Sequence, residues 1–276
     1  MSASDTPPAA AGLNPRLASA WPRPPRQVRV RLITPEELKS WILFEDERVV
    51  VIDKPGDVVC HPSKAGPASS LAGAVREFLG LAAAHLVFRL DRETSGVVLF
   101  AKTPEVAGHL QRAVRTRKSG KTYLAILTGE FSEPATVDQP LGADEKSVIV
   151  AKTAVNPAGH AAVTHFTPLS RGGGFTLARV VTATGRKHQI RAHAQWLGRC
   201  LVGDKLYGPD ERCFLDFIDG GWTAALAEKL LLPRQALHCA EIDLTKGGLD
   251  RVFSAPLPPD LRAFCETRGL AIPAGI

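Results

Sequence analysis

The densest part of the chain is residues 85–101, which read HLVFRLDRETSGVVLFA. Apolar and β-branched residues predict a strand over 85–90 and a second, buried strand over 97–101, and the polar residues 91–96 predict a loop between them. Strand ends with glycine-bearing loops are where a sheet presents reactive side chains, so Asp91 is a candidate catalytic carboxylate. A structural role competes with this interpretation, because a loop aspartate commonly hydrogen-bonds its own backbone.

Further strands and helices are predicted on both sides of this stretch. Alternating or continuous apolar residues predict strands over 28–32, 48–53, 122–127, 161–169, 175–182 and 237–244. Apolar periodicity and capping residues predict helices over 70–79, 103–115, 184–197 and 260–267. Strands outnumber helices and do not alternate with them regularly. The pattern therefore predicts an α+β fold on a mixed, mainly antiparallel sheet.

Composition indicates one folded domain behind a disordered tail. Residues 1–26 are rich in Ala, Pro and Ser, so they cannot bury enough apolar surface to fold, which leaves 27–276 as a single domain. The formal net charge of +6 favours a polyanionic partner, although a soluble protein that is merely basic explains it equally well.

What the sequence lacks limits the compartment and the cofactors that we expect. The five cysteines are spread out with no C-x-x-C pair, which argues against a disulfide framework or zinc site and indicates reduced thiols in a cytoplasm. The sequence contains no run of about 18 apolar residues, which a membrane helix would need. Signatures for nucleotides and for zinc are missing, and His188 and His193 lie five residues apart, so they would not share a helix face as metal ligands. An enzyme with this sequence is expected to use side chains alone.

Residues 89–96, RLDRETSG, match the signature R-L-D-x-x-T-S-G in full, and here the chain resembles the RluA-type family of RNA pseudouridine synthases. The family usually has His before the Arg, where this chain has Phe88. Further blocks of the resemblance follow in the family's order: VIDKPG (51–56) with HP (61–62), KTYLA (121–125), TGRKHQIRAH (184–193), GD (203–204) with YG (207–208), and LHC (237–239). Together they cover about residues 49–244.

The resemblance implies that the chain isomerises uridine in RNA to pseudouridine with Asp91 as the invariant carboxylate. This reaction breaks the bond from the sugar to the ring nitrogen, rotates the uracil and rejoins it through carbon, so it needs no redox cofactor. A carboxylate beside the anomeric carbon can stabilise an oxocarbenium ion, add to it covalently, or remove a sugar proton. The sequence leaves these three routes open.

Two more catalytic residues are implied by the resemblance. Arg191 matches the position expected to pair with Asp91, and its polar surroundings over 185–193 do not suit a helix that only packs. Tyr123 is expected to stack on the target base and to help move the ring proton. A solvated helix arginine and a core aromatic are the structural alternatives.

RNA contacts are expected from five further residues: Arg89, Lys121, Arg186, Lys187 and His188. Arg89 is the residue that the resemblance places where the target nucleotide leaves the RNA stack, because a guanidinium can stack on bases and contact phosphates. A simple ion pair of Arg89 with Glu93 or Asp91 is the alternative.

The resemblance also implies the wider setting of the enzyme. It implies a catalytic domain with a central cleft flanked by helices and loops, which acts on ribosomal or transfer RNA without a cofactor. We also expect a single-domain monomer in the cytoplasm, with no metal, membrane or obligate protein partner. The segment before Val28 is too short and proline-rich for the RNA-binding domain that some relatives carry, so target selection is expected from the catalytic domain. A non-catalytic RNA-binding protein on the same fold, or a nucleoside or glycoside hydrolase, are the alternatives. The hydrolase would need a second carboxylate that nothing in the sequence marks.

Overall fold

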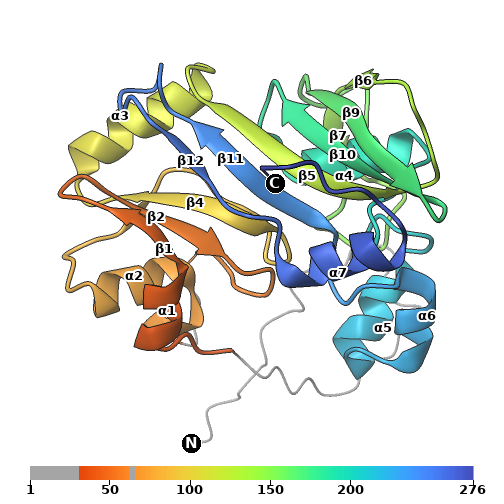
Figure 1. Ribbon diagram of the computed structural model, residues 1–276, viewed down its shortest axis with the longest axis horizontal. Helices are drawn as coiled ribbons and strands as arrows, with labels where there is room; N and C mark the ends of the chain where they lie inside the picture. Colours follow the sequence, from red (N-terminus) through yellow and green to blue (C-terminus); the bar gives the residue numbers. More distant parts are fainter. Residues whose placement is uncertain (1–30, 62–65, 276) are drawn as a thin grey trace, which may run out of the picture.

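The computed structural model of the chain describes residues 31–61 and 66–275 (Figure 1). The helices are α1 (Pro35–Trp41), α2 (Leu71–Phe78), α3 (Pro104–Arg115), α4 (Gln189–Trp196), α5 (Arg212–Gly220), α6 (Ala224–Leu230) and α7 (Pro259–Thr267), with a 3-10 helix η2 (Pro67–Ser69). The strands are β1 (Ile42–Glu45), β2 (Val49–Lys54), β3 (His85–Leu86), β4 (Ser95–Ala101), β5 (Gly120–Thr128), β6 (Ala135–Asp138), β7 (Leu141–Ala143), β8 (Thr153–Val155), β9 (Val163–Gly172), β10 (Phe175–Thr182), β11 (Leu237–Asp243) and β12 (Val252–Ser254).

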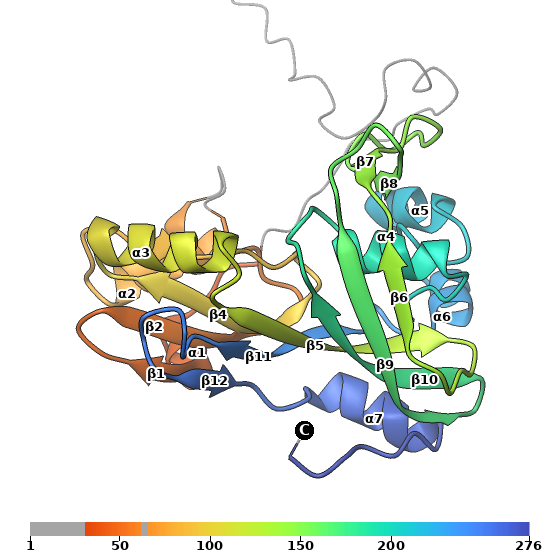
Figure 2. The ribbon, with the colours of Figure 1, turned by 90° about the horizontal axis from the view of Figure 1, so that it is seen from above.

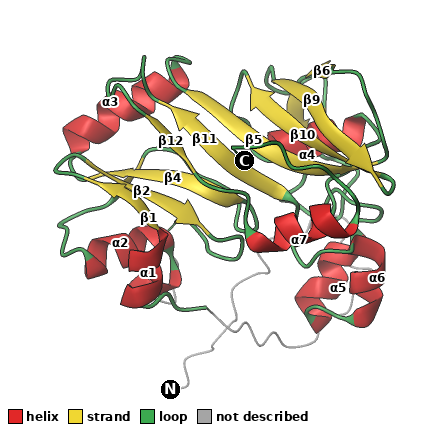
Figure 3. Cartoon of the chain, in the orientation of Figure 1, coloured by secondary structure: helices red, strands yellow, loops and turns green. Residues whose placement is uncertain are grey.

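Ten of these strands form one continuous sheet (Figure 3). Its order is β1-β2-β4-β11-β5-β10-β9-β6, with β12 beside β11 and β3 beside β4. Strands β4 and β11 pair in parallel, and the other strand pairs of the described chain are antiparallel. Strands β7 and β8 form a separate hairpin. The predicted α+β class with a mixed, mainly antiparallel sheet is confirmed.

Both faces of the sheet are covered by helices. Figure 2 shows α2 and α3 over one half of the sheet, α4 with α5 and α6 on the same side at the other half, and α7 on the opposite face. Alternate residues of β5 reflect this layering, because successive side chains of a strand point to opposite faces. Ala125 and Leu127 join the larger core with β2 and β4, whereas Leu124 and Ile126 join the core under α7.

Strand β4 occupies the centre of the fold and carries the candidate carboxylate at its start. All seven of its residues are buried between β2 and β11, as expected for a strand covered on both faces. Asp91 lies four residues before Ser95, in the loop that enters β4. A loop that leads into so rigid a strand can hold a side chain in one position.

Most elements near the signature form as predicted. Helix α2 begins after Ser70, whose hydroxyl accepts a hydrogen bond from the Gly73 amide, and α3 begins after Thr103, which caps Val106 in the same way. The hairpin of β9 and β10, strand β5, strand β11 and the terminal helix α7 also lie within a few residues of their predicted positions.

Two predicted elements are wrong in extent, and both differences bear on the site. The strand expected over 85–90 ends at Leu86, because the chain leaves the sheet after Val87 and delivers Arg89 and Asp91 to the pocket described below. The helix expected over 184–197 begins only at Gln189, since His188 has a left-handed φ of 54°. The residues before it form a loop that the Gln189 side chain organises.

Two further predictions concern the beginning of the chain. Residues 1–26, and residues 28–30 of the strand expected over 28–32, lie outside the described residues. Arg31 and Leu32, which are described, belong to no strand. Helices α1, α5 and α6 and strands β1, β6, β7, β8 and β12 were not predicted.

Candidate active site

Asp91 begins a tight turn at the entrance to β4. Its carbonyl accepts a hydrogen bond from the Thr94 amide at 3.1 Å, and its carboxylate is 23% exposed. The Thr94 hydroxyl in turn accepts a hydrogen bond of 2.7 Å from the amide of the buried Gln235. The turn therefore points one partly accessible carboxylate outward while its backbone is anchored to the segment that precedes β11.

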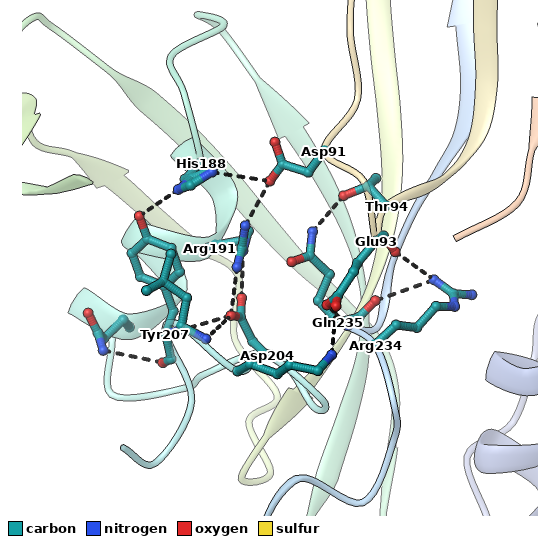
Figure 4. A network of polar contacts seen from close by, with 12 residues as sticks. Asp91, Glu93, Thr94, His188, Arg191, Asp204, Tyr207, Arg234 and Gln235 are labelled. Atoms are coloured by element: carbon teal, nitrogen blue, oxygen red, sulfur yellow. Dashed lines mark hydrogen bonds and ion pairs between the residues drawn. The ribbon is translucent and has the colours of Figure 1, made fainter. Parts of the chain in front are cut away.

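Arg191 of α4 joins Asp91 to a second, fully buried carboxylate (Figure 4). Its Nη1 donates to Asp91 Oδ2 at 2.9 Å, while Nε and Nη2 donate to the two oxygens of Asp204 at 2.7 and 2.8 Å. Asp204 Oδ1 also accepts the backbone amides of Leu206 and Tyr207 at 3.0 and 2.9 Å. Paired contacts of this kind fix the plane of a guanidinium, so Asp204 determines which nitrogen faces Asp91.

These contacts keep both carboxylates ionised. Burial acts to raise the pKa of Asp91, but the Arg191 guanidinium outweighs burial and leaves that pKa below its usual value. The pKa of Asp204 is also lowered, because Arg191 and two backbone amides overcome its burial. Burial opposes the charge of Arg191, yet Asp204 and Asp91 raise the pKa of its guanidinium above the usual range. The trio carries one net negative charge, and only Asp91 presents it to solvent.

His188 lies beside Asp91 in its neutral form. Burial and the neighbouring Arg191 lower the pKa of His188 to about 4. The Tyr207 hydroxyl accepts the Thr153 amide at 2.8 Å, so its own proton is free to go to His188 Nδ1 at 3.0 Å. A neutral imidazole that accepts at Nδ1 carries its proton at Nε2, which lies 3.9 Å from Asp91 Oδ2. That separation is too long for a hydrogen bond and leaves the N–H available to another molecule.

Tyr123 of β5 faces the same space. Its side chain is only 7% exposed, and burial raises the pKa of its phenol well above the usual value. The nearby Cys239 and Asp91 act in the same direction. Tyr123 is therefore a neutral phenol. It can stack on a base and donate a proton, but it does not start the reaction as a phenolate base.

The loop around Asp91 is held from two sides by buried cations. Lys54, which is fully buried at the end of β2, donates to the carbonyls of Pro55, Val58 and Arg92 at 2.8, 2.9 and 3.0 Å. On the other side the buried Lys205 forms an ion pair of 2.6 Å with Glu93. The three loop residues 91–93 are thus each tied to a different part of the fold.

One pocket of about 290 Å³ unites the predicted site residues. All eight of them line it: Arg89, Asp91, Lys121, Tyr123, Arg186, Lys187, His188 and Arg191. They come from three separate parts of the chain, namely the turn before β4, strand β5, and the loop and helix after β10. The ion pair considered for Arg89 is not formed within the described residues, where Glu93 pairs with Lys205 and Asp91 with Arg191. The pocket corresponds to the central cleft that the resemblance implied.

Several residues of the site were not assigned a role from the sequence. Asp204 and Tyr207 stand in blocks that the resemblance included, but their contacts with Arg191 and His188 span 13 and 19 residues. Gln235 contacts Thr94 across 141 residues. The signal that could have identified Asp204 is that it is the only acidic residue in residues 203–208, which belong to a block that resembles the family. Nothing local distinguishes Gln235.

Two further features follow from the described residues alone. Residues 31–61 and 66–275 bring together no group of three or more His, Cys, Asp or Glu side chains that could hold a metal ion. None of their helices has the length and apolar character needed to cross a membrane.

The comparisons with known proteins identify the family of the chain. The sequence profile of the family described as RNA pseudouridylate synthase matches residues 48–196. The ribosomal large subunit pseudouridine synthase D of Pseudomonas aeruginosa is 35% identical over 232 residues, covering 82% of this chain and 70% of the relative. Its namesake in Escherichia coli K12 is 31% identical over 238 residues, covering 84% and 71%.

A solved structure of low sequence identity to this chain supports the fold. Human RNA Pseudouridylate Synthase Domain Containing 4 superposes with a TM-score of 0.68 at 24% identity, covering 87% of this chain and 97% of the human chain. The resemblance drawn from residues 89–96 is confirmed. The chain belongs to the RNA pseudouridylate synthase family, of RluA type, and is an isomerase that acts on RNA.

Proposed function

We propose that this enzyme isomerises specific uridines of ribosomal RNA to pseudouridine, with Asp91 as the catalytic carboxylate and with no cofactor. The observation that carries the proposal is the arrangement of Asp91, Arg191 and Asp204, which keeps a carboxylate ionised at the edge of a pocket. An anion is useful there because the sugar carbon becomes electron-poor as its bond to the base breaks.

The proposed reaction rearranges one nucleotide without outside reagents. The bond between the sugar C1′ and uracil N1 breaks, the uracil turns within the pocket, and C1′ bonds to uracil C5. N1 takes up a proton and the hydrogen on C5 leaves to solvent as a proton, so the product is an isomer of the substrate. Asp91 can assist as a nucleophile, as an electrostatic partner of the oxocarbenium ion, or as a base toward the sugar.

Arg191 and Tyr123 have supporting roles in this proposal. Arg191 keeps Asp91 ionised and oriented, and Asp204 keeps Arg191 in place. Tyr123 offers the face of its ring to the uracil, and because its phenol is neutral we assign it donation of a proton to N1, after which the phenol regains a proton from solvent. A pocket that retains the detached uracil needs such a stacking wall.

The remaining predicted residues are proposed to bind RNA around the target uridine. Arg89, Lys121, Arg186 and Lys187 line the pocket and supply positive charge, which suits phosphates. Arg89 is available to fill the space that a flipped uridine leaves, since it has no ion pair within the described residues. His188 lies deeper, and its Nε2–H is suited to a polar atom of the uridine.

The names of the relatives favour ribosomal over transfer RNA as the substrate. The relatives from Pseudomonas and Escherichia are both named for the ribosomal large subunit, and the present chain aligns with more than two thirds of each. We propose large subunit ribosomal RNA as the first substrate to test, and transfer RNA as the second. We also propose that a single catalytic domain acts as a monomer in the cytoplasm; the lining of the pocket by residues of one chain supports the monomer, and the five unpaired cysteines support the cytoplasm.

Tritium release provides the test. Ribosomal and transfer RNA labelled with tritium at uridine C5, from a strain that lacks this gene, would be incubated with the wild type and with Asp91→Asn. The wild type is expected to release tritium from ribosomal RNA without added metal or nucleotide. Asp91→Asn is expected to release none above background, because an amide cannot carry the negative charge.

Each outcome has a definite meaning. Release by both proteins would remove Asp91 from the chemistry, and release from transfer RNA alone would change the substrate. Failure of the wild type to release tritium from either RNA, although it binds them, would favour an RNA-binding protein that has lost the reaction. Circular dichroism of Asp91→Asn is the control for folding, because this substitution also removes a partner of Arg191.

A further inference from the structure

A second, larger pocket adjoins the candidate active site. It encloses about 560 Å³ and lies between the end of α3, the start of β5, and the loop that follows β10. Five residues line both pockets: Lys121, Thr182, Thr184, Gly185 and Arg186. The two hollows are therefore neighbours that share a wall, and a chain molecule that enters one is positioned to enter the other.

The charge of this second pocket has one sign. Its lining includes Arg115, Arg117, Lys121 and Arg186, and no carboxylate. Neither Arg115 nor Arg117 forms an ion pair with another described residue. Surface arginines without acidic partners, gathered at a hollow, favour a polyanion as its ligand.

The backbone at the end of α3 holds Arg117 at the second pocket. Arg117 has a φ of 61°, the left-handed conformation that commonly follows a helix and that glycine adopts at least cost. The chain instead places a guanidinium there, at the mouth of the pocket. The Arg117 amide donates to the Val114 carbonyl at 3.4 Å and the Lys118 amide to the Ala113 carbonyl at 2.9 Å, as in a Schellman helix end, so this turn fixes the backbone that carries Arg117.

Lys121 stands on the shared wall. Its ammonium lies 4.7 Å from the centre of the Phe88 ring, and it forms no ion pair within the part of the chain that the structure describes. Burial lowers its pKa, although Cys239 opposes the shift. An ammonium stacked on an aromatic face and without a carboxylate can receive a phosphate at little cost from competing partners.

We propose that the second pocket binds the nucleotide next to the target uridine, and that Lys121 binds the phosphate that links the two. The inference rests on the proposed function, since it places the target uridine in the first pocket. The size of the hollow suits one nucleotide, because ligand pockets commonly measure about 300–1,000 Å³. Arg115 and Arg117 then contact the sugar-phosphate chain as it leaves toward α3.

A pair of matched double variants tests this subsite. Arg115→Ala with Arg117→Asn removes two cations that line the pocket, and asparagine tolerates the left-handed backbone at 117. The control, Arg112→Ala with Lys118→Ala, removes two exposed cations from the same segment that do not line it. Both variants change the net charge equally, so long-range attraction of RNA falls equally.

Two readouts separate the subsite from the reaction. Tritium release from labelled ribosomal RNA gives KM and kcat, and fluorescence anisotropy with a labelled single-stranded RNA of twelve nucleotides gives Kd at several salt concentrations. We expect the pocket variant to raise KM and Kd about tenfold or more, with kcat within about threefold of the wild type. The slope of log Kd against log salt concentration should fall by about one to two, because each lost phosphate contact lowers it by about one. The control should change each value less than about threefold.

The binding readout keeps the inference testable apart from the activity. If the wild type released no tritium, the proposed function would fail, while a selective loss of RNA affinity would still support a basic RNA subsite. Equal losses in both double variants would overturn the subsite, because they would reflect charge alone. Unchanged affinity in the pocket variant, or a fall in kcat with unchanged KM, would overturn it too. Arg115→Gln, which leaves the backbone at 117 untouched, repeats the test should the double variant misfold.

Discussion

The Asp204 carboxylate accepts two parallel hydrogen bonds from the Arg191 guanidinium, from Nε at 2.7 Å and from Nη2 at 2.8 Å. Both side chains are buried, and the nitrogen that remains, Nη1, points to Asp91. Asp204 does not line the 290 Å³ pocket, so we expect it to act on the reaction through residues that do, chiefly Arg191. We therefore assign it a positioning role.

Asp204→Asn is expected to lower kcat on the order of a hundredfold with little change in KM. The reason is that displacing a catalytic group by about 1 Å can lower the rate by that factor. The buried guanidinium also loses half of its charge compensation, which is expected to lower the free energy of unfolding by about 3 kcal/mol. Tritium release and urea unfolding measure the two effects. Asp91 itself is not substituted in this variant.

Asp260→Asn is the matched control for Asp204. Asp260 binds Arg234 through the same two-bond geometry, at 2.6 and 2.9 Å, but it is 40% exposed and does not touch Asp91. Partly exposed pairs contribute about 1 kcal/mol or less. A drop in kcat as large as that of Asp204→Asn would show that the loss of any buried arginine partner disturbs the fold, and Asp204 would lose its positioning role.

The extent to which the site could be predicted depends on sequence distance. The signature around Asp91, the hairpin and the caps of α2 and α3 are local, because each depends on residues within a few positions. The roles of Asp204, Tyr207 and Gln235 depend on contacts across 13 to 141 residues. No local pattern contains that information.

The misjudged elements have a similar explanation. Residues 87–90 are apolar enough for a strand, but the fold uses Phe88 and Leu90 to fill the core while the backbone turns away from the sheet. Residues 184–188 look polar and helical, but Thr184 and the Arg186 amide hydrogen-bond to the Gln189 side chain instead. Core packing overrides the strand preference at the first place, and side-chain hydrogen bonds within five residues override the helix preference at the second. Both places border the pocket.

The neutral state of His188 predicts a particular dependence of activity on pH. With a pKa of about 4, His188 does not titrate between pH 6 and 8, so kcat/KM should show no step near pH 6.5 that depends on this residue. The measurement is kcat/KM from pH 5 to 9 for the wild type and for His188→Gln, whose amide can still donate a hydrogen bond. An acid limb near pH 6.5 that is present in the wild type and missing in His188→Gln would contradict the neutral assignment.

His238 predicts a dependence of stability on pH. Burial lowers its folded pKa to about 4, while the unfolded value stays near 6.5. The unfolded chain therefore binds more protons between these values, and stability contributed by neutral His238 is present above pH 6.5 and declines as the pH falls toward 4. The loss between pH 7 and pH 5 is expected to be about 2 kcal/mol.

Urea unfolding at pH 7 and pH 5 measures that loss, with His238→Gln beside the wild type. Glutamine can keep the hydrogen bonds that the imidazole shares with the Ser95 hydroxyl and the Ala255 carbonyl, at 3.0 and 3.1 Å. It cannot take up the proton, so the variant should lose less stability than the wild type at pH 5. His165→Gln, at an exposed position, should leave the difference unchanged. Identical pH dependence in all three proteins would rule out His238 as the source.

Gly96 ends the signature, and its backbone predicts that no side chain is tolerated there. Its φ is 106°, and a Cβ would lie 2.2 Å from the Cys239 carbonyl oxygen, at the point where β4 and β11 pair in parallel. The obstacle is backbone, which cannot yield as a flexible side chain would. Gly96→Ala is therefore expected to cost more than about 2 kcal/mol and to displace the turn that carries Asp91.

Gly80→Ala separates this close approach from backbone conformation alone. Gly80 also has a positive φ, 62°, but nothing lies within 4 Å of a Cβ placed there. Its replacement is expected to cost about 1 kcal/mol and to leave kcat unchanged. Thermal unfolding and tritium release of the two variants measure the difference. Equal destabilisation would mean that the contact between β4 and β11 is not tight. A larger loss of stability in Gly96→Ala, with a lower kcat in the fraction that folds, would show that the last residue of the signature helps to position Asp91.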